Sequence, residues 1–231
     1  MYIYVTIEEV TEQDMISAML AKRNIEKDTG QPCMIINFKK LSANLIENIK
    51  PRGVIISGIG SDLQTFDKEE FRELNNILKN IDMPFLCICG SHQLLAEVYN
   101  KNIDEVDKFY HHPMRKLAAT DNGPLYPGDR AEYFITNGFY KIKKEKDDPI
   151  FEGLGDDIHM RCVHYCEVKE LPPDFVVLAS SEHCKIEAMK HKEKCLYGVQ
   201  FHTEAYKEPY TDGATILRNF ANIADNFWKD R

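Results

Sequence analysis

The chain has 231 residues, 43% of them hydrophobic, and a formal net charge of −8 at pH 7. This acidic balance, with no basic stripe along the sequence, argues against a general binder of nucleic acid or of anionic membranes. Seven irregularly spaced cysteines are typical of reduced thiols, and no apolar run is long enough to span a membrane, so we expect a cytoplasmic protein. The length suits one core, and we expect a single α/β domain over residues 1–231.

Predicted strands and helices alternate through the first half of the chain. Strands are expected at Tyr2–Ile7, Cys33–Phe38, Gly53–Ser57 and Phe85–Ile88, and helices at Glu12–Lys27, Leu41–Ile49 and Asp67–Lys79. The first of these helices has apolar residues at helical spacing, among them Met15, Ile16, Met19 and Leu20. Gly53–Ser57 is a continuous apolar strand, which is typical of a parallel strand covered on both faces.

The second half of the chain is predicted to be a series of shorter strands joined by turns. These strands are expected at Tyr133–Thr136, Phe139–Ile142, Ile158–Val168, Phe175–Ser180, Ile186–Lys190 and Tyr197–Phe201. The charged run Lys141–Asp148 is interpreted as a solvated turn, and Gly213–Trp228 as a closing helix that packs on the sheet. A helical first half followed by a β-rich second half predicts a mixed sheet.

Cys89 follows the apolar strand Phe85–Ile88 and precedes a helical segment that opens with Ser91. This is the pattern of a nucleophile elbow, a tight strand-to-helix turn that tolerates only small residues two before and two after the nucleophile. Those neighbours are Cys87 and Ser91, both small, and the start of the helix would favour the thiolate of Cys89. Buried strand cysteines that happen to precede a helix fit the same residues.

Two further segments carry residue types that such a nucleophile needs. Gly58, Ile59 and Gly60 follow a buried strand, where small residues let backbone amides approach a ligand, although this segment by itself favours a simple strand-ending turn. His202 and Glu204 lie at a strand end, so on an extended backbone both side chains can point the same way. A carboxylate beside an imidazole suits a base and its orienting group, and an ordinary exposed histidine is the alternative.

Together these segments resemble the class I glutamine amidotransferases. The resemblance rests on Cys87–Gln93 after a buried strand, Ser57–Gly60 after an earlier strand, and Gly198–Glu204, in the family's order and spacing. It implies a flavodoxin-like three-layer sandwich, with a mixed, mostly parallel sheet, helices on both faces and the site at the C-terminal strand edge. Neither an organic cofactor nor a metal is expected.

The resemblance also implies roles for particular residues. Cys89 would be the nucleophile, His202 the general base and acid, and Glu204 the group that orients the imidazole. The implied reaction is attack on the side-chain amide carbon of glutamine, loss of ammonia, and hydrolysis of a γ-glutamyl thioester. Because the catalytic residues are retained, a catalytically silent binding or regulatory relative is disfavoured.

The same carry-over assigns the surroundings of the nucleophile. The backbone amide of Gly90 and one from the loop at Gly58 and Ile59 would form the oxyanion hole, and Gln93 matches the family position that contacts glutamine. No catalytic atom is lost where the chain departs from the family's usual residues, which it does at Cys87, Ser91, Ile59 and Thr203.

Several residues outside these motifs have chemistry of their own. A cluster of potential metal ligands comprises Cys162, His164, Cys166, His183, Cys184 and Cys195. Their spacing is not that of a zinc ribbon or finger, which favours buried thiols and packed histidines over a bound metal. Arg115 or Arg130 could contact a substrate carboxylate, and the sequence does not select between them.

Two functions therefore stay open. The chain is too short to include a synthetase domain, so it could be a glutaminase subunit that delivers ammonia to a separate synthetase protein. It could instead be a stand-alone γ-glutamyl hydrolase or transferase, which would act without a partner on γ-glutamyl amides or peptides.

Overall fold

The computed structural model describes residues 1–8, 11–123, 130–229 and 231. In this part of the chain nine strands form one sheet, and five α-helices pack against it. The strands are β1 (Tyr2–Thr6), β2 (Cys33–Asn37), β3 (Gly53–Ile56), β4 (Phe85–Ile88), β5 (Thr136–Lys144), β6 (Asp157–His164), β7 (Phe175–Ser180), β8 (Ala188–His191) and β9 (Leu196–Val199). The α-helices are α1 (Glu12–Thr29), α2 (Ala43–Ile49), α3 (Arg72–Asn80), α4 (Gly90–Asn100) and α5 (Asp212–Lys229).

The sheet has a parallel half and an antiparallel half. Its strand order is β2-β1-β3-β4-β9-β8-β7-β5-β6. The pairings from β2 to β9 are all parallel, and those from β9 through β8, β7 and β5 to β6 are all antiparallel. The predicted mixed sheet is therefore confirmed.

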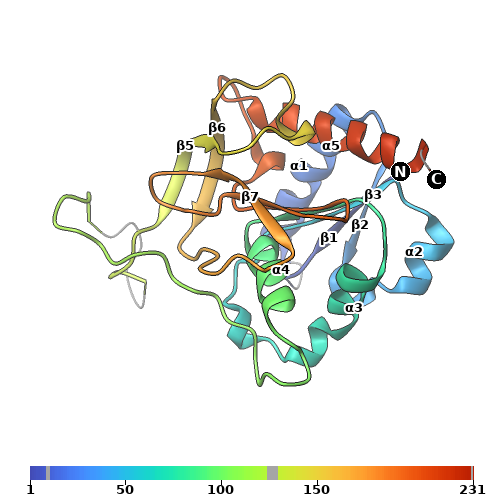
Figure 1. The fold of residues 1–231 in the computed structure, drawn as a ribbon, viewed down its shortest axis with the longest axis horizontal. Helices are drawn as coiled ribbons and strands as arrows, with labels where there is room; N and C mark the ends of the chain where they lie inside the picture. The colour runs from blue at the N-terminus through green and yellow to red at the C-terminus, as the bar shows by residue number, and fades with distance from the viewer. Residues whose placement is uncertain (9–10, 124–129, 230) are drawn as a thin grey trace.

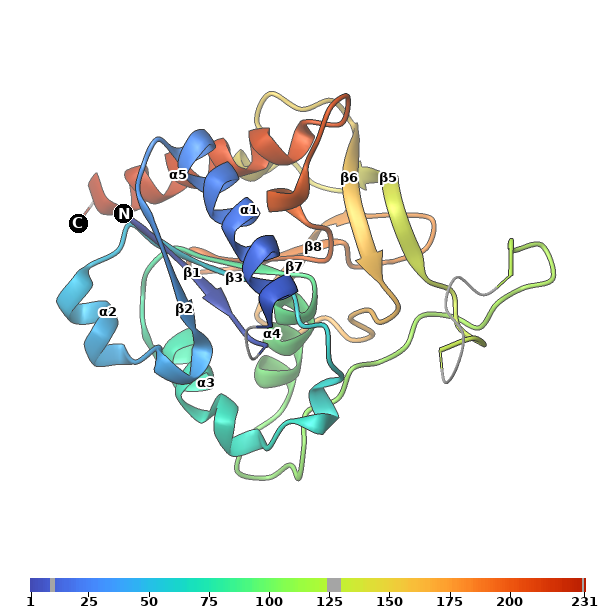
Figure 2. The same cartoon turned by 180° about the vertical axis from the view of Figure 1, so that it is seen from behind.

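Helices cover both faces of the parallel half (Figure 2). Because side chains alternate along a strand, Val54 and Ile56 of β3 pack with α3 and α4 on one face. Ile55, between them, faces the opposite way and belongs to the cluster that includes residues of α1 and α5. This arrangement of helices, sheet and helices confirms the three-layer α/β sandwich.

Helix α1 packs through small residues rather than through its largest apolar ones. Ala18, Ala21 and Ile25 are buried against the sheet and α5. The apolar residues that the sequence placed at helical spacing, Met15, Ile16, Met19 and Leu20, are instead 47–51% exposed. Alanines allow the close approach of α1 to its neighbours, so its contact face is not its most hydrophobic face.

Some predicted boundaries are wrong, and strand pairing explains the main one. The run Lys141–Asp148 is not wholly a turn, because β5 continues to Lys144. Strand β5 pairs with β6 residue by residue. Ile142 is buried and Lys141 and Lys143 are exposed, so these two lysines lie on the solvent face of the strand. Helix α3 begins at Arg72, after a 3₁₀ turn at Lys68–Phe71.

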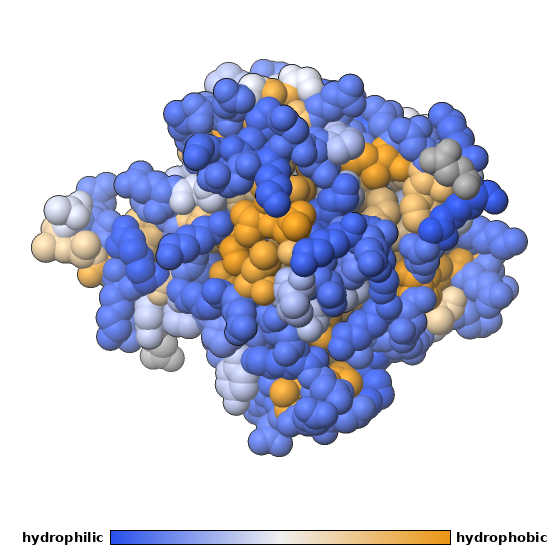
Figure 3. Space-filling model, viewed as in Figure 1, coloured by the Kyte–Doolittle hydropathy of each residue, from blue (hydrophilic) through white to orange (hydrophobic). Residues whose placement is uncertain are grey.

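The segment between α4 and β5 first packs on the body of the protein, where Ile103 and Phe109 are buried, and its later part then projects away from it (Figure 1). Short bridges attach its described part to the rest, among them the pairing of Pro113 with Cys166. Seen from the same side in space-filling form, the surface of the protein is mainly hydrophilic, with an apolar area near its centre (Figure 3). Among the described residues, no helix is both long and apolar enough to cross a membrane.

Candidate active site

The predicted site residues follow the C-terminal ends of three adjacent parallel strands. Gly58 and Ile59 follow β3, Cys89 follows β4, and His202 lies three residues beyond β9. Because β3, β4 and β9 are neighbours that run in parallel, these loops meet at one edge of the sheet.

Cys89 occupies a strained turn between β4 and α4. Its backbone has φ 53° and ψ −112°, a conformation that residues with a Cβ rarely adopt. Its amide donates to the carbonyl of Val199 at 2.7 Å, which ties the turn to β9. The Oγ atom of Ser91 accepts from the amide of Ile88 at 2.7 Å and lies 2.9 Å from the carbonyl oxygen of Ile56. The serine, one of the departures from the family's usual residues, therefore binds the elbow to β3.

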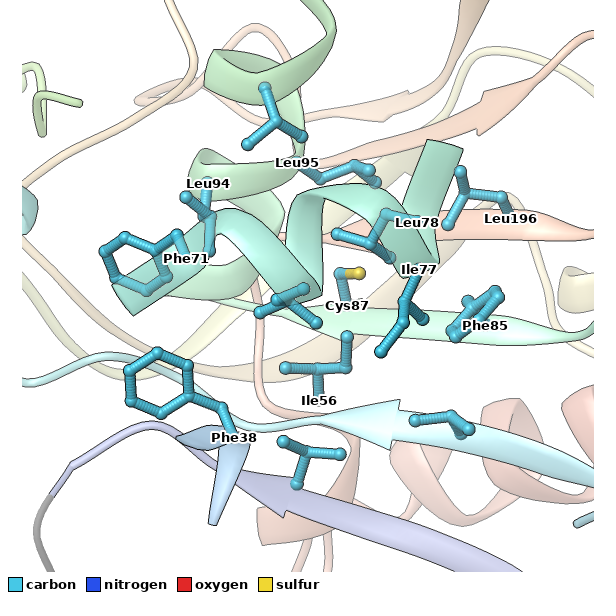
Figure 4. Packing of buried hydrophobic residues seen from close by; sticks show 14 of the residues in the cluster. Phe38, Ile56, Phe71, Ile77, Leu78, Phe85, Cys87, Leu94, Leu95 and Leu196 are labelled. Atoms are coloured by element: carbon cyan, nitrogen blue, oxygen red, sulfur yellow. The ribbon is translucent and has the colours of Figure 1, made fainter. Parts of the chain in front are cut away.

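Cys87 and Cys89 lie in different surroundings although they are only two residues apart. Cys87 is fully buried beneath α3 and α4, among Ile77, Leu78 and Leu95 (Figure 4). Burial raises the pKa of its thiol well above the usual value. Cys89 instead packs with the residue cluster on the other face of the sheet and lines two cavities. Only Cys89 is therefore positioned to meet a ligand.

His202 and Glu204 form a hydrogen-bonded pair beside Cys89. The imidazole Nδ1 of His202 donates to Oε1 of Glu204 at 2.8 Å, which leaves Nε2 for the sulfur side. Burial by itself lowers the pKa of this imidazole, but the charges of Glu204 and of the Cys89 sulfur together raise it well above its usual value. The amide of Asn24 donates to the backbone carbonyl of Glu204 at 2.8 Å and holds the loop on α1.

Gly58 lies in the narrow space between the imidazole and the cysteine. A Cβ atom there would lie 3.1 Å from Cε1 of His202 and 3.4 Å from Cβ of Cys89. Both contacts are tight or at the limit of ordinary packing, so the absence of a side chain lets the two groups approach one another. A close backbone approach is predicted for the glycines of this loop, and at Gly58 the glycine leaves room for the imidazole beside the cysteine.

Gly90 packs equally tightly against Ile59. A Cβ on Gly90 would lie 2.5 Å from the Cβ of Ile59 and 2.6 Å from its backbone nitrogen, closer than real Cβ contacts occur. Gly90 is the first residue of α4, so its amide has no acceptor within its own helix. The two candidate oxyanion donors are thus on backbone segments in direct contact beside Cys89.

Gln93 connects to Cys89 through a residue that the sequence analysis did not single out. Its Nε2 donates to the carbonyl of Cys166 at 2.8 Å and to Oε1 of Gln200 at 2.9 Å. Gln200, which is fully buried, in turn donates from Nε2 to Sγ of Cys89 at 3.6 Å. Gln200 lies in the same short stretch of sequence as His202 and Glu204, and this position could have identified it as a site residue.

A pocket of 290 Å³ opens on the Gln93 side of Cys89. Its lining includes Arg130, whose guanidinium stacks 3.6 Å from the ring centroid of Tyr165 and approaches Asp62 at 3.5 Å. Arg115, the other candidate for a substrate carboxylate, is paired with Asp121 at 2.7 Å and does not line this pocket. The structure therefore selects Arg130 over Arg115 as the candidate partner of a substrate carboxylate, a choice that the sequence did not allow.

A second cavity, of 600 Å³, opens on the His202 side of Cys89. It runs past Glu8, whose Oε1 accepts from the amides of Gly60 and Ser61 at 2.8 and 2.7 Å. Leu20, one of the exposed apolar residues of α1, also lines it. Cys89 therefore lies between a smaller pocket and a larger one.

Comparison with known proteins identifies related sequences over most of the chain. The family model for "Glutamine amidotransferase class-I" matches residues 15–224. A glutamine-hydrolyzing GMP synthase subunit of Pyrococcus abyssi is 38% identical over 181 residues, which cover 77% of this chain and 78% of the relative. The protein of the same name from Methanosphaera stadtmanae is 31% identical over 182 residues, or 79% and 80% of the two chains.

Solved structures share the fold at low sequence identity. A Thermoplasma acidophilum protein, described as a candidate GMP synthase subunit, has a TM-score of 0.73 and 20% identity, with 99% of this chain and 96% of that one covered. A glutamine amidotransferase from Thermotoga maritima has a TM-score of 0.57 and 19% identity, with 99% and 85% covered.

Proposed function

This chain belongs to the class I glutamine amidotransferase family, and we propose that it is the glutamine-hydrolysing subunit of a GMP synthase. It hydrolyses the side-chain amide of glutamine and releases ammonia for a separate synthetase protein. Relatives named as glutamine-hydrolyzing GMP synthase subunits, from several organisms, support this function over that of a stand-alone γ-glutamyl hydrolase. The protein acts in the cytoplasm as a single domain over residues 1–231.

The hydrogen bond between His202 and Glu204 beside Cys89 is the observation that carries the proposal. The Sγ atom of Cys89 attacks the amide carbon of glutamine while His202 holds the thiol proton and then transfers it to the leaving ammonia. A water molecule gives its proton to His202 and attacks the resulting thioester, which releases glutamate and the free thiol. Glu204 fixes the tautomer of the imidazole and stabilises its positive charge.

Backbone amides stabilise the negative oxygen that forms in both steps. The amide of Gly90, at the N-terminus of α4, supplies one donor and the helix dipole adds to it. The loop at Gly58 and Ile59 supplies the second donor. Its close contact with Gly90 supports this assignment, because both segments border the same space beside Cys89.

The 290 Å³ pocket is the proposed site for the amino-acid end of glutamine. Arg130 is the cation placed to pair with the α-carboxylate, and arginine suits this task through its planar fork of donors. Oε1 of Gln93 is buried without a partner, so it is available to accept from the α-ammonium group. Gln200 is a positioning residue that orients Gln93 and donates to the sulfur.

Ammonia release from glutamine by the purified protein tests this proposal. We expect turnover that Cys89→Ala abolishes and Cys87→Ala, a matched control two residues earlier in the chain, leaves intact. Addition of the synthetase protein together with its substrates should raise the rate. Partner-independent turnover of γ-glutamyl peptides in preference to glutamine would instead establish the stand-alone hydrolase, and unchanged turnover in Cys89→Ala would refute the assigned nucleophile.

A further inference from the structure

A second group of chemically active side chains lies at the wall of the glutamine pocket, and one of its members, His164, lines that pocket. Cys162 and His164 point to the same face of β6, and Glu187 immediately precedes β8. Ligand atoms of these three residues all lie within 4.8 Å of one another, and the residues are only 0%, 4% and 1% exposed. Within the described residues, no other histidine, cysteine or carboxylate of the neighbourhood joins this group.

Two atoms of the group are buried acceptors without a partner. His164 donates from Nδ1 to the carbonyl of Cys166 at 3.0 Å, so its Nε2 carries a lone pair that no group satisfies. Glu187 accepts at Oε1 from the hydroxyl of Ser181 at 2.7 Å, and its Oε2 is likewise unsatisfied. A buried acceptor left in this state is destabilising, which favours an occupant between the two.

The geometry points to a Zn²⁺ ion bound by Cys162, His164 and Glu187, with a water molecule as the fourth ligand. Lone pairs on nitrogen and oxygen require a proton, a water molecule or a cation between them, and the adjacent sulfur favours a cation that accepts thiolate, imidazole and carboxylate together. The partners at Nδ1 of His164 and Oε1 of Glu187 are of the kind that hold metal ligands in orientation.

The charges of the three groups suit a buried divalent cation. A neutral imidazole, a thiolate and a carboxylate together carry two negative charges, which one Zn²⁺ ion balances. A Zn²⁺ ion that displaces protons from the thiol and the carboxyl group leaves a neutral buried cluster, which a low-dielectric interior favours.

The ion would stabilise the wall of the active site. Val163, between two of the ligands, lines the pocket, and its carbonyl accepts from Sγ of Cys89 at 3.7 Å. Glu187 is fixed by backbone hydrogen bonds, accepting at its carbonyl from the amide of Gln200 at 2.7 Å. Zinc would therefore bind β6 to the start of β8 and keep the wall at its distance from the nucleophile.

Cobalt substitution tests the site in a Cys89→Ala background, which removes the thiol of the proposed nucleophile as an alternative cobalt ligand. Titration with Co²⁺ alone should give about one bound ion per chain and a near-ultraviolet thiolate charge-transfer band. Cys162→Ser in this background should abolish the band. Cys195→Ser, which removes a cysteine outside the cluster, should retain it.

Metal content and thermal stability give independent readouts. The purified wild-type protein should contain zinc, and chelation should lower the unfolding midpoint of the Cys89→Ala protein. Glu187→Gln should abolish the effect of chelation on the unfolding midpoint. If Cys162→Ser does not fold, Glu187→Gln tests the site in its place. A protein that contains no zinc and gives no cobalt band would overturn the proposed metal site. A water molecule or a proton would then bridge Nε2 of His164 and Oε2 of Glu187. If that protein still hydrolyses glutamine, the proposed function stands without the metal.

Discussion

The two halves of the sheet differ in how they are built and in what they contribute. β1, β3, β4 and β9 of the parallel half are buried on both faces, whereas β5 and β6 at the antiparallel edge alternate between buried and exposed residues. Loops from the parallel half carry the proposed reacting groups. The antiparallel half and the segment before it form the pocket wall. Changes in the first half should therefore lower kcat, and changes in the second should raise KM.

Apart from loss of the nucleophile itself, the largest expected effect is that of Gly90→Ala, in the parallel half. The added methyl group would displace the backbone of Ile59, so both oxyanion donors would move. We expect kcat for glutamine to fall by about 10³-fold, measured as ammonia release. Gly155→Ala, which adds a methyl group where no atom lies within 4 Å, is the matched control. Full activity in Gly90→Ala would exclude this part of the oxyanion hole.

Glu204→Gln should lower kcat by about 10²-fold, because the imidazole loses its orienting carboxylate. Glu204 helps to raise the pKa of His202, so its removal moves the titration of the imidazole to lower pH. The imidazolium then loses its proton at lower pH than in the wild type, which ¹⁵N NMR of the ring nitrogens measures. Glu97→Gln, which alters a second carboxylate paired with a histidine, His112, should leave both quantities unchanged.

Arg130→Gln tests the pocket wall. The loss of a charged partner for the α-carboxylate should raise KM for glutamine by about 10- to 100-fold with kcat nearly unchanged. Arg115→Gln changes the same residue type outside the pocket and should have no effect on KM. A fall in kcat with constant KM would place Arg130 with the reacting groups and blur the distinction between the two halves.

Gln200→Leu lies at the boundary between the halves and should have a smaller effect. The sulfur of Cys89 loses a donor, and Gln93 loses one of its two acceptors. We expect alkylation of Cys89 by iodoacetamide to slow by about 10-fold, because the donor stabilises the thiolate that reacts. An unchanged rate of alkylation would show that Gln200 does not stabilise the sulfur of Cys89 and contributes only to packing.

The smallest effect on catalysis is expected for Cys87→Ala. The thiol is surrounded by core side chains, so its loss leaves a small cavity and destabilises the protein by about 1–2 kcal/mol. Chemical denaturation measures this loss, and kcat should remain that of the wild type. Reduced kcat in a fully folded Cys87→Ala protein would contradict the separation of the two cysteines.

The same contrast explains what the sequence could predict. The fold class and the elements of the parallel half could be predicted, because buried strands and the small residues of a tight turn are local patterns. Arg130, Gln200 and Glu187 act through contacts between segments that are distant in the sequence, so no local pattern indicates what they contact. The contact face of α1 was missed because alanines at its interface carry little hydrophobic signal.

The backbone at Cys89 has a consequence for selection. A residue with a Cβ at φ 53° and ψ −112° loses about 1–3 kcal/mol of stability, whereas glycine adopts this region with little strain. Evolution toward stability alone would therefore replace the cysteine with glycine. A strained cysteine in a turn that suits glycine indicates that the position has been selected for its sulfur, at the expense of the turn.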